Sequence, residues 1–128
     1  MSKIFVIVNP WAIQDCEEIL LDIDIHGTQL KRARVTAVPE EIIREHYAHK
    51  VGMPYFEPMI RGLVGQSVEL AVYRGDTDRF NELKPVIRGK YNPRFSPAPD
   101  FKKEAVHFSD SEEAAVREMR LWGSFLEL

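Results

Sequence analysis

The residues best placed to do chemistry are a histidine and the polar residues that follow it. The stretch 104–112, EAVHFSDSE, puts His107 in a short hydrophobic run, and Ser109 and Glu112 have the spacing of a capping box at the start of a helix. The start of a helix exposes free backbone N–H groups and a partial positive charge, which together stabilise a phosphate. Imidazole also accepts a phosphoryl group near neutral pH, since its ordinary pKa is about 6.5. The pattern therefore indicates a histidine sited to meet a phosphoryl group; the alternative is a strand histidine that does no chemistry.

Two further histidines, His46 and His49, are three residues apart on an expected helix, a spacing that can ligate a metal. No cysteine or third ligand lies near them in the sequence, so we interpret them as a surface pair and predict no metal site. Cys16 falls on the apolar face of another expected helix and is predicted to belong to the core.

Hydrophobic periodicity predicts the elements that position these residues. Strands are expected at 3–8, 28–38, 67–75 and 104–108, with one slip of phase in the alternation over 28–38. Helices are expected at 11–25, 40–51, 55–65 and 76–89, with a last helix starting at Ser109 and a proline-rich loop at 92–101. Without the extra helices the order is βαββαβ, which predicts an α/β (α+β), ferredoxin-like fold with a four-stranded, mainly antiparallel sheet and helices packed on it.

Length and composition narrow the class of protein. A chain of 128 residues predicts a single domain over 1–128, and a net charge of −3 argues against binding along a nucleic-acid backbone. The single cysteine fits a reducing compartment. The apolar run before Asn9 is too short for a signal peptide or a membrane span, so a cytoplasmic protein without membrane association is expected.

Four segments resemble one known family over nearly the whole chain. His-x-Ser-Asp-Ser at 107–111, followed by Glu118 and then Leu-Trp, resembles the active-site signature of nucleoside diphosphate kinases. Three other segments are similar to the family in the same order: FVIVNPWAIQ at 5–14, EHYAHKVGMPYFEPMIRGLV at 45–64 and VIRGKYNP at 86–93. The fold of that family is the ferredoxin-like βαββαβ arrangement predicted above.

The resemblance implies transfer of the terminal phosphate of a nucleoside triphosphate to a nucleoside diphosphate through a phosphohistidine. His107 matches the nucleophile, Glu118 the glutamate that orients it through its far ring nitrogen, and Ser109 a serine that bonds to that glutamate. Three positions match residues that bind the nucleotide: Tyr47 near the phosphates, Tyr55 stacked on the base and Met59 beneath it. The resemblance further implies Mg²⁺ bound with the nucleotide and a homo-oligomer built from dimers.

The chain departs from the family where the phosphates should bind. Asn9 stands where the family has a lysine, Tyr91 replaces a threonine, and the family's helical arginine falls at Pro85, so Arg88 on nearly the same helical face is the expected substitute. Glu104 puts a negative charge where the family has an asparagine. The loop before the histidine is short, and its cations are Arg94, Lys102 and Lys103.

These departures leave two functions open. The chain is either a divergent kinase with a rebuilt set of phosphate-binding cations, which is the preferred hypothesis, or a catalytically impaired nucleotide-binding, regulatory or interaction protein of the same fold. Losing one phosphate-binding donor costs about 2.7–4 kcal/mol of transition-state stabilisation, so the cations decide between them.

Overall fold

Four strands form one sheet in the computed structural model, which describes residues 1–127. The spatial order is β2-β3-β1-β4, and every neighbouring pair is antiparallel. The strands are β1 (Ser2–Val8), β2 (Thr28–Val35), β3 (Val68–Gly75) and β4 (Val106–Phe108). The predicted ferredoxin-like sheet is confirmed, and a β-bulge between Gln29 and Lys31 explains the slip of phase in the second strand.

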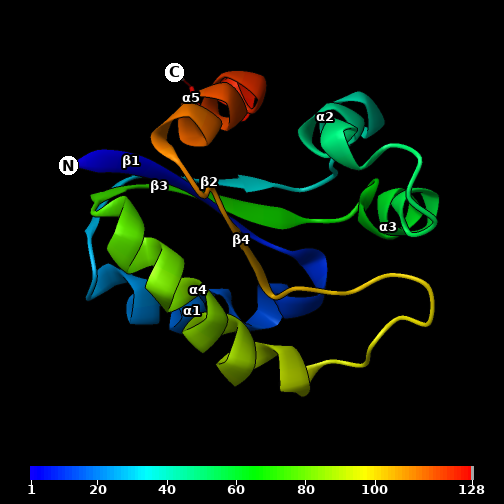
Figure 1. The fold of residues 1–128 in the computed structure, drawn as a ribbon, viewed down its shortest axis with the longest axis horizontal. Coiled ribbons are helices and arrows are strands. Elements are labelled where there is room, and N and C mark those ends of the chain that lie inside the picture. The colour runs from blue at the N-terminus through cyan, green and yellow to red at the C-terminus, as the bar shows by residue number, and fades with distance from the viewer. Residues whose placement is uncertain (128) are drawn as a thin grey trace.

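Helices cover both faces of this sheet. The α-helices are α1 (Cys16–Asp24), α2 (Glu40–His46), α3 (Phe56–Leu63), α4 (Thr77–Tyr91), α5 (Glu112–Leu121) and α6 (Gly123–Leu126). Three short 3₁₀ helices are η1 (Pro10–Asp15), η2 (Ala48–Lys50) and η3 (Asn92–Arg94). Figure 1 shows α1 and α4 on one face of the sheet and α2, α3 and α5 on the other.

The two layers of helices explain the hydrophobic central strands. Successive side chains of β3 point to opposite faces, so Tyr73 belongs to the core under α1 and α4, while Leu70 and Val72 belong to the core under α2, α3 and α5. A strand covered on both faces is apolar throughout rather than alternating. No helix within residues 1–127 is long and apolar enough to cross a membrane.

Several predicted element boundaries are wrong. The helix expected at 11–25 begins as η1 and becomes α-helical only at Cys16, and the helix expected at 40–51 is broken at Tyr47 between α2 and η2. Helix α4 runs through Pro85 to Tyr91 instead of ending at Gly89.

The helix that the sequence predicts to start at Ser109 is α5, which begins at Glu112. Ser111 is its cap, with a side-chain oxygen that accepts a hydrogen bond from the backbone of Ala114 at 3.1 Å. Ser109 is unavailable because both its backbone N–H and its hydroxyl bond to the backbone of Phe5, each at 2.8 Å. These bonds extend the contact with β1 beyond the end of β4.

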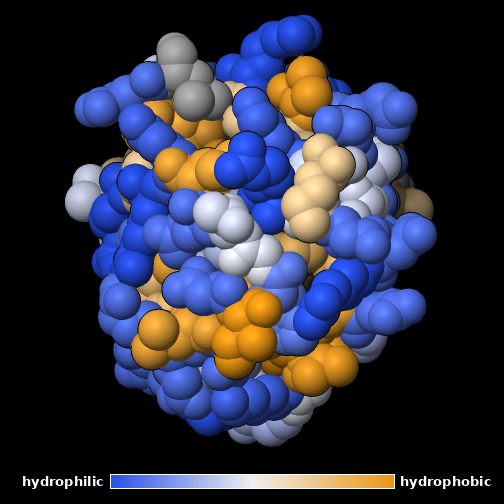
Figure 2. Space-filling view, turned by 90° about the vertical axis from the view of Figure 1, so that its left-hand side faces the viewer, coloured by the Kyte–Doolittle hydropathy of each residue, from blue (hydrophilic) through white to orange (hydrophobic). Residues whose placement is uncertain are grey.

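Apolar side chains also remain at the surface. Figure 2, which views the molecule from the side of its N-terminus in Figure 1, shows hydrophobic residues in patches between hydrophilic ones. The large exposed hydrophobic residues of the whole described chain are Met1, Leu21, Ile25, Leu30, Val51, Met53, Val86 and Val116.

Candidate active site

His107 is held at the middle of β4, the shortest strand. It lies directly opposite Ile7 of β1, and opposite residues of an antiparallel pair share a face of the sheet. Ile7 belongs to the core under α2, α3 and α5, so the imidazole is directed into that layer of helices. The side chain of His107 is 18% exposed, which leaves one edge of the ring accessible.

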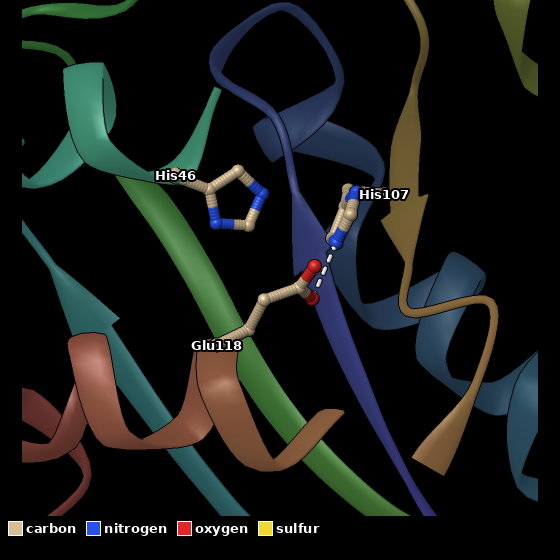
Figure 3. A group of neighbouring side chains, drawn as sticks. All are labelled: His46, His107 and Glu118. Atoms are coloured by element: carbon tan, nitrogen blue, oxygen red, sulfur yellow. Dashed lines mark hydrogen bonds and ion pairs between the residues drawn. The ribbon is translucent and has the colours of Figure 1, made fainter. Parts of the chain in front are cut away.

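Glu118 of α5 fixes the orientation of this ring. Its Oε1 lies 2.8 Å from His107 Nε2, and the glutamate side chain is 7% exposed (Figure 3). An ionised carboxylate only accepts hydrogen bonds, so Nε2 carries the proton and Nδ1 keeps its lone pair. Within residues 1–127 no hydrogen bond engages Nδ1. The arrangement therefore presents an unprotonated nitrogen that is free to act as a nucleophile.

His46 completes a buried group around His107. It projects from the end of α2 toward the same point as Glu118 (Figure 3), and its ring packs edge-to-face on the His107 ring with centroids 4.6 Å apart. Trp122, which is fully buried, donates its indole N–H to His46 Nδ1 at 3.1 Å. The prediction of a surface pair is therefore wrong for His46 and right for His49, which is exposed.

The tautomer of His46 bears on whether this group binds a metal. One ligand atom each of His46, His107 and Glu118 lies within 4.8 Å of the others, a spacing compatible with an ion. An indole N–H can only donate, so His46 Nδ1 must accept and Nε2 must carry the ring proton. One nitrogen is then occupied and the other protonated, while a metal needs a free lone pair. The donor set suits a hydrogen-bonded cluster better than a metal site.

Burial controls the protonation of the cluster. It lowers the pKa of His107 to about 3, helped by the positive charges of Lys84 and Arg88, and it lowers the pKa of His46 to about 3. Burial also raises the pKa of the Glu118 carboxyl and raises the pKa of Tyr47 to about 12. Both histidines are consequently neutral at physiological pH, as a nucleophilic imidazole must be.

We expect the free energy of unfolding to fall as the pH drops from 6.5 toward 3. In this window the unfolded chain protonates His46 while the folded chain does not, so acid favours unfolding by up to about 1.4 kcal/mol per pH unit. Urea unfolding at pH 7 and pH 5 should show a weaker pH dependence for His46→Gln than for wild type. The exposed His49 is the matched control, and His49→Gln should behave as wild type. Equal pH dependence in all three proteins would contradict this account.

A narrow cleft opens beside His107. It has a volume of about 100 Å³, and the predicted residues that line it are Asn9, Tyr47, Met59, Arg88 and His107. Lys102 and Glu104, which the sequence analysis placed near the phosphates, also line it, together with three residues that it did not assign to nucleotide binding: Trp11, Lys50 and Leu63. A site for a whole drug-sized ligand usually measures about 300–1,000 Å³, so this cleft has room for part of a nucleotide.

Glu104 compensates two of the cations in the cleft. Its Oε2 lies 3.4 Å from Arg88 Nε, its Oε1 lies 3.3 Å from Lys102 Nζ, and it accepts a hydrogen bond from Asn92 at 2.8 Å. Arg88 also donates to the carbonyl of Val106 at 3.2 Å. Arg88 thus reaches the end of the histidine strand, as its helical face predicted.

The structure places three predicted residues elsewhere. Tyr91 is fully buried and its hydroxyl donates to Asp22, because Tyr91 faces α1 rather than the cleft. Arg94 is paired with Glu18 of α1 through two hydrogen bonds of 2.9 and 3.0 Å. Ser109 bonds to Phe5, and within the described chain no hydrogen bond links it to Glu118. Geometry therefore supports neither a nucleotide contact for Tyr91 and Arg94 nor the expected bond between Ser109 and Glu118.

Tyr55 is not among the residues that line the cleft, but its ring lies beside Lys50, which does line it. It is half-buried at the start of α3, and its ring and that of Tyr47 both lie 5.6 Å from the ammonium group of Lys50. Lys50 and Lys84 are cations near His107 to which sequence reasoning gave no role. Lys50 lies three residues after Tyr47 in the sequence. A lysine on a polar helix face is common, so this spacing alone does not predict a functional role.

Comparison with known proteins gives a consistent result. The family model described as "Nucleoside diphosphate kinase" matches residues 2–127. The chain is 33% identical to the nucleoside diphosphate kinase of Bacillus licheniformis, an alignment that covers 95% of this chain and 88% of that protein. It is 29% identical to the nucleoside diphosphate kinase of Streptococcus thermophilus, over 95% of this chain and 98% of that protein.

Two solved structures share the fold. The nucleoside diphosphate kinase of Encephalitozoon cuniculi superposes with a TM-score of 0.80 at 24% identity, covering 95% of this chain and 88% of the other. That of Aquifex aeolicus superposes with a TM-score of 0.73 at 21% identity and covers 98% of both chains.

Proposed function

This chain belongs to the nucleoside diphosphate kinase family, and we propose that it transfers the terminal phosphoryl group of a nucleoside triphosphate to a nucleoside diphosphate through His107. The observation that carries the proposal is the 2.8 Å contact between His107 Nε2 and Glu118, which leaves Nδ1 free beside the cleft.

The reaction has two matching halves. Nδ1 of neutral His107 attacks the terminal phosphorus, the bond from that phosphorus to the bridging oxygen breaks, and the nucleoside diphosphate leaves with the electron pair. The imidazole becomes positively charged, and the Glu118 carboxylate stabilises it through the proton on Nε2. A second nucleoside diphosphate then attacks the phosphohistidine by the reverse route and restores neutral His107.

The cations of the cleft would hold the phosphates. We assign Arg88 to this role and add Lys102, since both line the cleft with His107. Asn9 would line the cleft without binding a phosphate, because its side-chain amide already donates a hydrogen bond to the backbone carbonyl of Glu104 at 2.8 Å. Tyr47 and Met59 line the same cleft, and the ring of Tyr55 lies 5.6 Å from the ammonium group of Lys50, which supports their proposed contacts with the nucleotide.

We propose Mg²⁺ as the ion that accompanies the nucleotide. Glu104 is the carboxylate that lines the cleft, and its oxygens already face Arg88, Lys102 and Asn92. The residues present therefore fit an ion that is carried mainly by phosphate oxygens, as Mg²⁺ commonly is. When bound, the ion would neutralise charge on the phosphates.

We further propose that the chain acts as a homo-oligomer built from dimers. Strand β2 is an edge strand of the sheet. Leu30 on this strand is 41% exposed, and Leu21 of α1 and Ile25 just after it are 65% and 77% exposed. An exposed edge strand beside apolar side chains is a common site at which two protein chains associate.

The buried, unpaired Cys16 supports a reducing, cytoplasmic location.

The function is tested by following one phosphoryl group through both half-reactions. After incubation with ATP and Mg²⁺, the intact protein should gain the mass of one phosphoryl group, and the modification should be labile in acid. Addition of GDP should remove it and yield GTP. Stabilisation by ATP without a phosphoenzyme would contradict the proposal and point to a nucleotide-binding protein.

A further inference from the structure

The cleft beside His107 contains one cation without a carboxylate partner. Three positively charged residues line the cleft, and two of them, Arg88 and Lys102, face Glu104 at 3.4 and 3.3 Å. Within residues 1–127 no carboxylate lies within 4.0 Å of the Lys50 ammonium group. Among the described residues, Lys50 is therefore the cation of the cleft that has no carboxylate partner.

The chain around Lys50 fixes its position. It is the last residue of η2, and its backbone N–H donates to the carbonyl of Tyr47 at 2.8 Å. That turn follows α2 directly, whose last residue, His46, is anchored to Trp122. The ammonium group lies 5.6 Å from the centroids of both the Tyr47 and Tyr55 rings, where aromatic faces favour a cation.

A cation is needed at this place. Position 9 provides an asparagine whose amide is bound to Glu104, so the start of η1 brings no positive charge to the cleft. Most of what a protein contributes to phosphoryl transfer is positioning and electrostatic stabilisation of the phosphate oxygens. An ammonium group that lines the same cleft as His107 and has no carboxylate partner among the described residues can supply that stabilisation.

We propose that Lys50 binds the phosphoryl group in transfer and takes the part expected of a lysine at position 9; the assignment rests on the proposed function. The electrostatics of His107 agree with this geometry. The positive charge of Lys50 is one of those that lower the pKa of His107, so the ammonium group is close enough to act on the ring. Both residues line the cleft in which a phosphate on His107 would be held.

The test compares three substitutions at matched lysines. Lys50→Gln removes the charge, and Lys50→Arg keeps it. Lys3→Gln removes an exposed charge near the N-terminal end of β1, whereas the C-terminal end of that strand leads to Asn9 in the cleft. We expect phosphoenzyme formation from ATP and Mg²⁺ to be about 100-fold slower in Lys50→Gln, since loss of one such donor typically costs 10²–10³ in rate. Lys50→Arg should keep most of the rate, and Lys3→Gln should match wild type.

A binding measurement separates a phosphate contact from mere packing on the tyrosines. The shift in thermal unfolding midpoint caused by a non-hydrolysable ATP analogue, which carries the terminal phosphate, should shrink in Lys50→Gln, while the shift caused by adenosine should be unchanged. If Lys50→Gln reduced the shifts caused by both ligands equally, the proposal would be overturned. That result would mean that Lys50 contacts the nucleobase or supports the packing of the cleft rather than the phosphate.

The outcomes distinguish this proposal from the proposed function. If wild type and Lys50→Gln form phosphoenzyme at equal rates, Lys50 has no role in transfer while the kinase function stands. If wild type forms none but Lys50→Gln loses the shift caused by the ATP analogue and keeps the shift caused by adenosine, Lys50 binds phosphate and the kinase function fails. If wild type neither reacts with ATP nor is stabilised by the ATP analogue, both proposals fail.

Discussion

Replacing His107 by alanine is expected to abolish the phosphoenzyme. The nucleophile is lost, and no other described residue presents a free imidazole nitrogen in the cleft, since His46 has Nδ1 engaged by Trp122 and Nε2 protonated. Removal of a nucleophile typically costs at least about 10⁴-fold in rate. Intact-protein mass after incubation with ATP and Mg²⁺ should therefore show no gain in His107→Ala.

The control for this variant is an exposed histidine of the same region. His49→Ala should gain one phosphoryl group as wild type does. Because His107→Ala leaves the buried Glu118 carboxyl without its partner, His107→Gln serves as a second variant whose amide can donate to Glu118. Stabilisation by ADP in either variant would show that the cleft is intact. A phosphorylated His107→Gln protein would show that another residue is the nucleophile.

Replacing Glu118 by glutamine is expected to slow phosphoenzyme formation by about 10²–10⁴-fold, since an analogous loss of a histidine's carboxylate partner costs about 10⁴. The glutamine amide can donate to His107 Nε2, which moves the ring proton to Nδ1 and blocks the attacking lone pair. Glutamine also cannot neutralise the imidazolium that forms. The rate is measured by stopping the reaction with ATP at successive times and following the protein mass.

Glu113 provides the matched control for Glu118. It lies exposed on the same helix, and Glu113→Gln should react at the wild-type rate. Stabilisation by ADP should persist in Glu118→Gln, because Glu118 contacts the histidine and does not line the cleft that holds Lys50 and Arg88. If Glu118→Gln reacted as fast as wild type, the orienting role of Glu118 would be wrong.

Local patterns predicted the architecture well. Short apolar runs such as 3–8 and 67–75 are strands in the structure, and the slip of phase over 28–38 corresponds to a bulge. These features depend on neighbours a few residues apart in the chain, so their signal is present in the sequence itself. The exact ends of elements were less predictable, because Ser109 pairs with Phe5 from the far end of the chain.

The phosphate-binding residues were predicted only in part. Arg88 reaches the cleft as its helical face indicated, while Arg94 pairs with Glu18 and Tyr91 bonds to Asp22, both partners on α1. These partners are distant in sequence, so no local pattern reveals that the side chains are already occupied. Lys50 was missed for the opposite reason, because only the packed structure shows that it lacks a carboxylate partner.

The sequence by itself determined the order of strands and helices, the identity of His107 and Glu118 as a motif, and the absence of a lysine at position 9. The tertiary structure alone decided which nitrogen of His107 is free, which tautomer His46 adopts and which cations remain uncompensated. The reason is physical: protonation and ion pairing depend on burial and on partners such as Trp122 and Glu104 that only packing brings within hydrogen-bonding distance.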